Sequence, residues 1–218
     1  MRVPVTVWAL AILASPAMAL DIRIDFKQYA ANPPGDWNTI NATPTNLPVK
    51  DYLTGDTADG VLFTMSTSSY SWTFANATGA WNTANPGPAW LDDQKLAAMD
   101  YANLGWNLTG YLTFDGLDPD QVYTIELIAS RNAAQADAEY RIGNEVIMFN
   151  PQTHGYVNGK WMTWTDISPD ATGKISIQCG KLGSHSYNVY VNALRLTPEP
   201  ATVALLVLGG LGMIRRKL

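Results

Sequence analysis

About ten short segments of apolar, β-branched and aromatic residues run through this chain, with turn residues between them. The first alternates Ile22, Ile24 and Phe26 with Arg23 and Asp25, which is the period of a half-buried strand. The other segments lie at residues 61–66, 70–74, 108–114, 122–130, 138–142, 145–149, 161–167, 174–179 and 187–196. So many short strands can bury their apolar faces only by pairing into sheets that pack on one another.

Turn signals between these segments favour antiparallel pairing. Gly143-Asn144 predicts a two-residue hairpin turn, and Asp118-Pro119-Asp120 predicts a type I turn. Only Leu91 to Ala102 carries a helical pattern, and residues 32–60 are rich in loop signals. We therefore expect an all-β fold, an antiparallel β-sandwich or jelly roll.

The first 19 residues have the three parts of a secretory signal peptide. Arg2 is followed by an apolar stretch from Val3 to Ala14 and then by Ala17 and Ala19 in an A-x-A arrangement. The stretch is shorter than the roughly 20 residues that span a bilayer. We expect a signal helix that signal peptidase cuts after Ala19.

The opposite end is also apolar. Residues 201–214 are apolar apart from one threonine and several glycines, and Arg215, Arg216 and Lys217 follow. Glycines weaken a buried core helix, whereas basic residues after an apolar segment stay on the cytoplasmic side of a membrane. This pattern predicts one C-terminal apolar helix that lies in the membrane of the precursor. Two alternatives remain: the helix anchors the chain only until a protease cleaves it, or the mature protein retains it.

Pro198-Glu199-Pro200, the apolar segment and the basic cluster together resemble the PEP-CTERM sorting signal of Gram-negative bacteria. This tail is also named after the C-terminal domain of an ice-binding protein, although the resemblance implies no ice binding. It implies that an exosortase-type membrane protease recognises the tripeptide and releases the protein to the cell surface or matrix. Together with the signal peptide at 1–19, the resemblance predicts an ectodomain at 20–197 and a sorting signal at 198–218.

The ectodomain resembles the galactose-binding-like jelly rolls that are common in PEP-CTERM proteins. The resemblance lies in "IRIDF...GDWNTI", "LTFDGLDPDQVYTIELIASR" and "YVNALRL", with Gly35, Trp37 and Asn38 forming a Gly-x-Trp-Asn loop. Lys27 departs from the glycine that is frequent in that family. The resemblance implies structural roles for Tyr123, in the core, and for Asn192, which would tie a loop to a strand end.

Charge and cysteine content exclude several classes of protein. Without the two terminal signals, ten Lys and Arg face 18 Asp and Glu, so the ectodomain has a net charge near −8. A nucleic-acid partner is not expected with that balance. Cys179 is the single cysteine, so no intrachain disulfide forms, and its alternating surroundings predict a buried thiol.

Tryptophan is the unusual residue of the ectodomain. Trp161 and Trp164 are three apart, which places them on opposite faces of a strand. Trp37, Trp81 and Trp90 lie among Gly, Pro and Asn residues. These three loop residues are our candidates for a glycan-stacking platform, and the alternative is that they plug the ends of the sandwich.

Metal and catalytic motifs are not evident. Asp92 and Asp93 could bind calcium, but their spacing matches no calcium loop, so we expect no metal and no other cofactor. His154 and His185 lie in separate predicted loops. The sequence contains no G-x-S-x-G and no H-E-x-x-H motif.

We therefore expect an exported, non-enzymatic protein of the cell surface or extracellular matrix, sorted by an exosortase-type system, with an adhesion or scaffold role. One alternative is a carbohydrate-binding module that uses the loop tryptophans and has a polysaccharide partner. A further alternative is a glycan-active hydrolase, which would need two facing carboxylates in an open groove.

Overall fold

The computed structural model describes residues 20–27, 33–68, 71–75, 80–91, 95–105, 108–134, 137–180 and 188–200. Residues 20–199 belong to one compact unit. The predicted signal peptide at 1–19 and the predicted apolar helix at 201–214 lie outside the described residues. Within the described ranges, no helix has the length and apolarity needed to cross a membrane.

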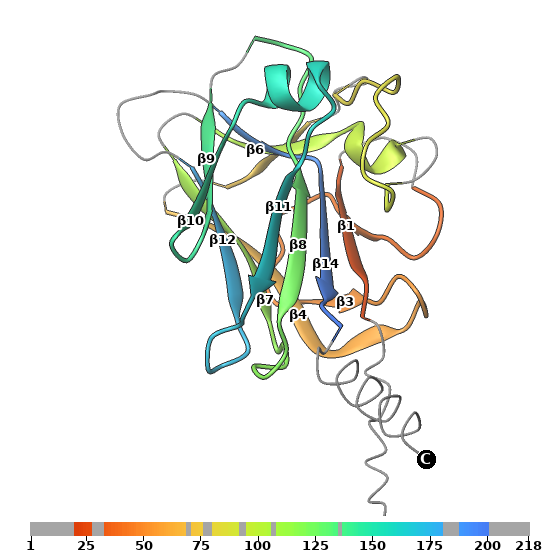
Figure 1. Cartoon of the computed structure of the whole chain (residues 1–218), viewed down its shortest axis with the longest axis vertical. Coiled ribbons are helices and arrows are strands. Elements are labelled where there is room, and N and C mark those ends of the chain that lie inside the picture. The colour runs from red at the N-terminus through yellow and green to blue at the C-terminus, as the bar shows by residue number, and fades with distance from the viewer. Residues whose placement is uncertain are drawn as a thin grey trace, which may run out of the picture. The chain divides into compact units, whose positions relative to one another are not determined.

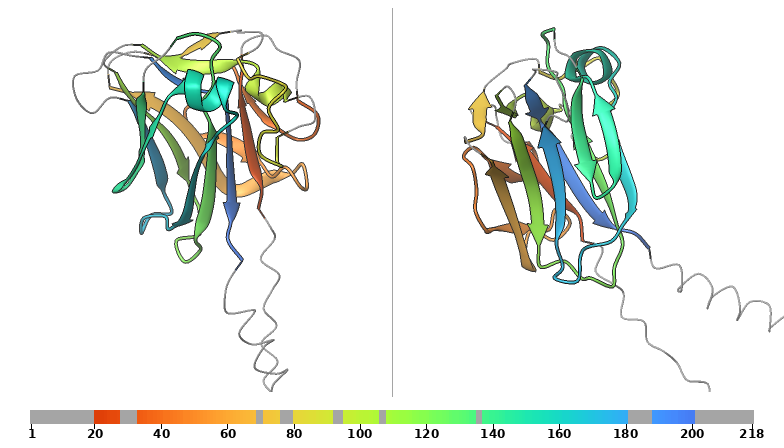
Figure 2. Two further views of the ribbon diagram at one scale, coloured as in Figure 1. Left: turned by 45° about the horizontal axis from the view of Figure 1, so that its top comes forward. Right: turned by 90° about the vertical axis from the view of Figure 1, so that its left-hand side faces the viewer.

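Two β-sheets pack face to face (Figures 1 and 2). Sheet A has the order β11 (Met162–Ile167), β8 (Tyr123–Ile128), β14 (Ala193–Pro198), β1 (Ile22–Phe26), β2 (Asn38–Ile40). Sheet B has the order β10 (Glu145–Phe149), β9 (Ala138–Ile142), β12 (Ile175–Gly180), β7 (Thr109–Asp115), β4 (Thr57–Thr67), β3 (Leu47–Lys50). The expected antiparallel β-sandwich is confirmed, although β1 and β2 pair in parallel.

A third, smaller sheet lies near one end of the sandwich (Figure 2). It consists of β13 (Val189–Val191), β6 (Tyr101–Leu104) and β5 (Thr73–Ala75). The segment 187–196 is therefore two strands rather than one, because Asn192 interrupts it. The Asn192 side chain accepts from the Ser130 N–H (2.7 Å) and donates to the Asp100 carbonyl (2.9 Å). This confirms the expected tie between a loop and a strand end.

The helical prediction for Leu91 to Ala102 is wrong. Its described part contains only the 3-10 helix η1 (Leu96–Ala98), and β6 then begins at Tyr101. Tertiary pairing decides the outcome, since β6 is the central strand of the small sheet. Conversely, the expected loop around His154 contains the π-helix η2 (Pro151–Val157), which the Asn150 side chain caps by accepting two backbone N–H bonds.

Both predicted turns are present. Gly143 has a positive φ of 56° between β9 and β10, and the Gln121 N–H donates to the Asp118 carbonyl at 3.2 Å. Tyr123 after the second turn is buried, as expected, and its hydroxyl accepts from the Asp118 N–H. Gly116 before this turn has φ 79°, and a Cβ there would lie 2.1 Å from the Gly60 carbonyl oxygen.

The main core fills the space between sheets A and B. Alternate residues of each strand point inward, among them Ile125 and Leu127 of β8 and Ile177 and Cys179 of β12. Trp164 of β11 is also in this core with 1% of its surface exposed, whereas Trp161 is half-buried. The predicted placement of the two tryptophans on opposite faces is confirmed.

Candidate functional site

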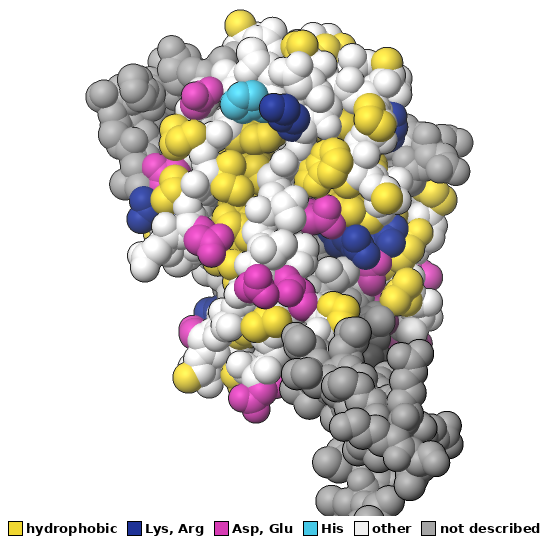
Figure 3. All heavy atoms as spheres, viewed as in Figure 1, with side chains coloured by type: hydrophobic (Ala, Val, Ile, Leu, Met, Phe, Trp, Pro, Cys, Tyr) yellow, Lys and Arg dark blue, Asp and Glu magenta, His cyan; other side chains and the backbone are white. Residues whose placement is uncertain are grey.

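The outer face of sheet A carries a row of polar side chains. The strand registers place Thr163 of β11 beside Glu126 of β8, Glu126 beside Arg195 of β14, and Arg195 beside Arg23 of β1. Outward-facing positions alternate with core positions along each strand. Figure 3 shows this face, on which side chains of both charges lie among hydrophobic ones.

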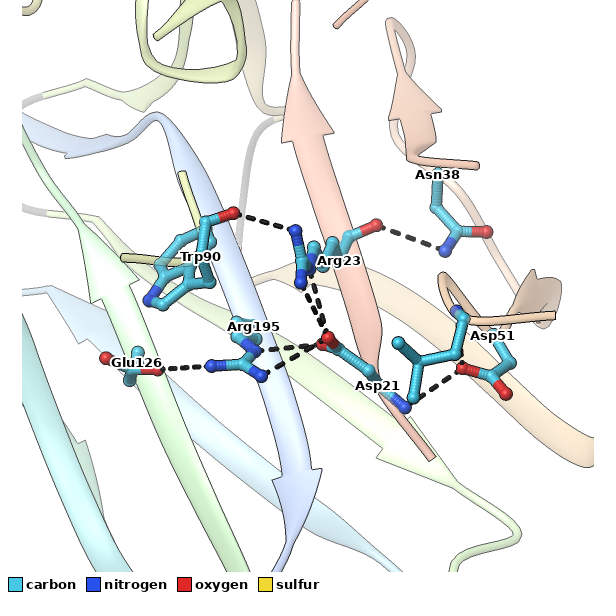
Figure 4. Close-up of polar contacts among 8 residues, drawn as sticks. Asp21, Arg23, Asn38, Asp51, Trp90, Glu126 and Arg195 are labelled. Atoms are coloured by element: carbon cyan, nitrogen blue, oxygen red, sulfur yellow. Dashed lines mark hydrogen bonds and ion pairs between the residues drawn. The ribbon is translucent and has the colours of Figure 1, made fainter. Parts of the chain in front are cut away.

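Asp21 connects the charged members of this row (Figure 4). Its carboxylate accepts from Arg23 Nη2 at 2.8 Å and from Arg195 Nε at 2.9 Å. Arg195 also lies 3.4 Å from the Glu126 carboxylate. Burial alone would raise the pKa of Asp21, but the hydrogen bonds from Arg23 and Arg195 outweigh it and hold that pKa below its ordinary value.

Further contacts join this network to the loops around it. Arg23 Nη1 donates to the Trp90 carbonyl at 2.8 Å, and its guanidinium lies 3.5 Å from the Tyr52 ring centroid. The Asp21 N–H donates to Asp51 Oδ1 at 3.0 Å. Four hydrogen bonds from two arginines occupy the Asp21 carboxylate. We therefore assign this network a structural role, in which it joins β1 and β14 to the loops around them.

A second apolar cluster, here called the cover, lies on the outer face of the same sheet. Trp37, Trp81 and Trp90 pack there with partners that include Ile128 and Ala193, the outward residues of β8 and β14. The three tryptophans expose only 7%, 1% and 5% of their surface. The candidate glycan-stacking platform is therefore corrected: the three rings are buried against the outer face of sheet A and present no open face to a sugar ring.

The Gly-x-Trp-Asn loop explains how Trp37 reaches this cover. Gly35 has φ 85°, and a Cβ there would lie 2.7 Å from the Tyr52 ring. Asn38 donates to the Arg23 and Lys50 carbonyls at 3.1 and 2.9 Å and accepts from the Lys50 N–H. The loop motif thus directs a tryptophan inward and ties β2 to its neighbours.

Trp161 is an aromatic residue that remains partly accessible on this face. It is half-buried and packs against the tryptophan cluster on one side. Together with Gly159, Lys160 and Thr163 it lines an open hollow of about 340 Å³. An aromatic surface with a hydroxyl and an ammonium group beside it can contact the C–H face and the hydroxyls of a sugar ring. The spacing of Trp161 and Trp164 was the sequence signal for this site.

The other candidates do not form a second site in the described part of the chain. His154 accepts from the Asn150 N–H through Nδ1 at 3.1 Å and packs edge-on against Phe149. His185, Asp92 and Asp93 lie outside the described residues. Among the residues that the structure describes, no three His, Cys, Asp or Glu side chains are grouped as metal ligands. Burial raises the pKa of the Cys179 thiol far above its ordinary value.

The PEP-CTERM protein-sorting motif matches residues 196–217. The match begins inside β14, whose last residue is Pro198. The chain therefore carries the sorting signal of an exported protein that exosortase-type machinery processes. Arg215, Arg216 and Lys217 of this signal lie outside the described residues.

Two carbohydrate-binding modules are among the solved structures that are similar to this chain. TmCBM61, solved in complex with beta-1,4-galactotriose, is 12% identical, with 73% of this chain and 100% of that chain covered and a TM-score of 0.36. A carbohydrate-binding module from the β-sandwich superfamily, described as having promiscuous specificity, is 16% identical, with 72% and 64% covered and a TM-score of 0.31. No curated protein matches the chain.

Proposed function

We propose that this chain is the precursor of a non-enzymatic cell-surface or matrix protein, whose compact unit is the exported cargo. The sorting motif at residues 196–217 carries this proposal, because it begins within the last strand of the sandwich. Signal peptidase would release the chain at Leu20, and an exosortase-type protease would then separate the sandwich from its tail. An adhesion or scaffold role in a polysaccharide-rich layer fits an acidic, exported sandwich.

Localisation of the full chain tests this function. An epitope-tagged chain and a variant that ends at residue 200 would be expressed in a bacterium with an exosortase-type protease and in a strain without it. We expect the full chain at the surface of the first strain, beginning at Leu20 by N-terminal sequencing, and in the membrane fraction of the second. Equal distribution of both chains in both strains would contradict a sorting role for the tail.

A second candidate function is glycan binding at the hollow beside Trp161. The supporting observation is the half-buried ring itself, because a tryptophan fixed from behind by other side chains loses little entropy on contact with a ligand. Lys160 and Thr163 supply polar groups at its edge. The buried tryptophans Trp37, Trp81 and Trp90 would act only as the support for this ring.

Binding of residues 20–200 to an array of bacterial and algal polysaccharides, followed by titration calorimetry, tests this candidate. We expect Trp161→Ala to weaken binding about tenfold or more, as for a central aromatic contact. Tyr111→Ala is the matched control, because Tyr111 is 37% exposed on β7 of the other sheet. An equal loss in both variants, or none in Trp161→Ala, would rule out the hollow as the binding site.

A further inference from the structure

The folded domain holds Glu199, the central residue of the Pro-Glu-Pro tripeptide, at four points. Its N–H donates to the Val122 carbonyl at 2.9 Å, and its carbonyl accepts from Gln121 Nε2 at 2.8 Å. Its carboxylate oxygen Oε1 accepts from Thr124 Oγ1 at 2.7 Å and from the Asp166 N–H at 2.8 Å. Both the backbone and the side chain of Glu199 are therefore engaged.

The Asp166 contact depends on an irregular piece of β11. The register of β11 against β8 shifts between Trp164 and Ile167, and Asp166 has a φ of 57°. A left-handed conformation is uncommon and costly for a residue other than glycine, and bulges redirect backbone groups out of the ladder. Here the redirected N–H donates to Glu199. These bonds, first from Asp166 and then from Thr124, lower the pKa of the Glu199 carboxyl.

The preceding residue is also part of the sheet. Pro198 is the last residue of β14 and lies opposite Tyr123 of β8. Pro198 and Glu199 are both half-buried. A protease that recognises an extended peptide uses the peptide's backbone groups and side chains. In Glu199 these groups are already bonded to β11, to β8 and to the turn before β8.

We propose that the folded sandwich masks its own sorting tripeptide, so that a processing protease can bind Glu199 only after residues 198–199 detach from sheet A. This masking rests on the exosortase-type processing proposed above. When only the undocked form is competent, the processing rate falls in proportion to its population. Local stability at the end of β14 would therefore set the rate at which the mature protein is released.

The double variant Thr124→Val with Gln121→Met removes two donors to Glu199 and leaves the tripeptide intact. Each lost hydrogen bond weakens docking several-fold, so we expect the Asp166 N–H of the full chain in detergent to exchange about tenfold faster. Thr113→Val is the matched control, because it removes one hydroxyl bond, to Ser176 Oγ at 2.9 Å, in sheet B. Unchanged exchange at Asp166 in the double variant would overturn the docking itself.

Pulse-chase labelling in a bacterium that carries the protease measures the consequence. We expect the double variant to be processed about tenfold faster than the wild type, and Thr113→Val at the wild-type rate. Equal rates for all three chains would overturn masking. A wild-type chain that is processed in neither the protease-bearing strain nor the protease-free strain would overturn the function of the tail as well. Failure of the masking proposal and failure of the proposed sorting function therefore give different results.

Discussion

Replacement of Asp21 by asparagine removes the charge at the centre of the arginine network and nearly preserves the shape of the side chain. The carboxylate is 4% exposed and accepts four hydrogen bonds, at 2.8 and 3.1 Å from Arg23 and at 2.9 and 3.2 Å from Arg195. Loss of one partner of a buried ion pair costs about 3–5 kcal/mol. Arg195 is 26% exposed, so solvent screening lowers this figure.

We expect Asp21→Asn to lower the free energy of unfolding of residues 20–200 by about 2–3 kcal/mol. For a domain of this size, that loss lowers Tm by roughly 4–12 °C. Thermal unfolding followed by circular dichroism measures it. Asp59→Asn is the control, because Asp59 is exposed on β4, and such surface changes stay within about 0.5 kcal/mol.

The pH dependence tests the same reasoning. Because the folded-state pKa of Asp21 lies below its ordinary value, its charge contributes stability in full above that ordinary value. The contribution disappears as the pH falls through the folded-state pKa. The difference between wild type and Asp21→Asn should therefore be largest at neutral pH and shrink below about pH 4. A variant as stable as the wild type at pH 7, or a difference that is independent of pH, would refute this account.

Two further predictions concern the turn before β8 and the thiol. Gly116→Ala should cost about 2–3 kcal/mol in urea unfolding, since its Cβ would meet the Gly60 carbonyl. Gly143→Ala, where a Cβ meets nothing within 4 Å, should cost only about 1–2 kcal/mol, and equal costs would contradict the steric argument. Cys179 should react with Ellman's reagent at pH 8 only after denaturation, because the thiol is fully buried; rapid reaction of the folded chain would show that its strand opens.

The sequence was sufficient to predict the longer strands because their own patterns decide their structure. β8 and β12 alternate over six residues each and are found where the pattern placed them. β2 and β3 were missed because they are edge strands of only three and four residues, which is too short for a clear alternation of apolar and polar residues. Pro48 lies within β3, and proline is tolerated in a strand at such an edge.

The candidate site was less predictable, because the tryptophan cluster that covers the outer face of sheet A comes from segments far apart in the sequence. Trp37 stacks near Trp90, with 5.9 Å between ring centroids, and no local pattern connects residues so distant. The spacing of Trp161 and Trp164, by contrast, is local and correctly placed the two rings on opposite faces of a strand. Arg23 and Arg195 were readable as outward positions of their strands, but their shared partner Asp21 required the pairing of β1 with β14.

That pairing also affects the order in which the chain can fold. Ile22 lies opposite Leu196, so β1 cannot pair with β14 until the last strand of the sandwich is available. Contacts of such large sequence separation slow folding. An exported chain would thus cross the membrane before its first strand has a neighbour in β14. We expect sheet B, whose strands lie between residues 47 and 180, to be able to form earlier, with closure of sheet A as the final event.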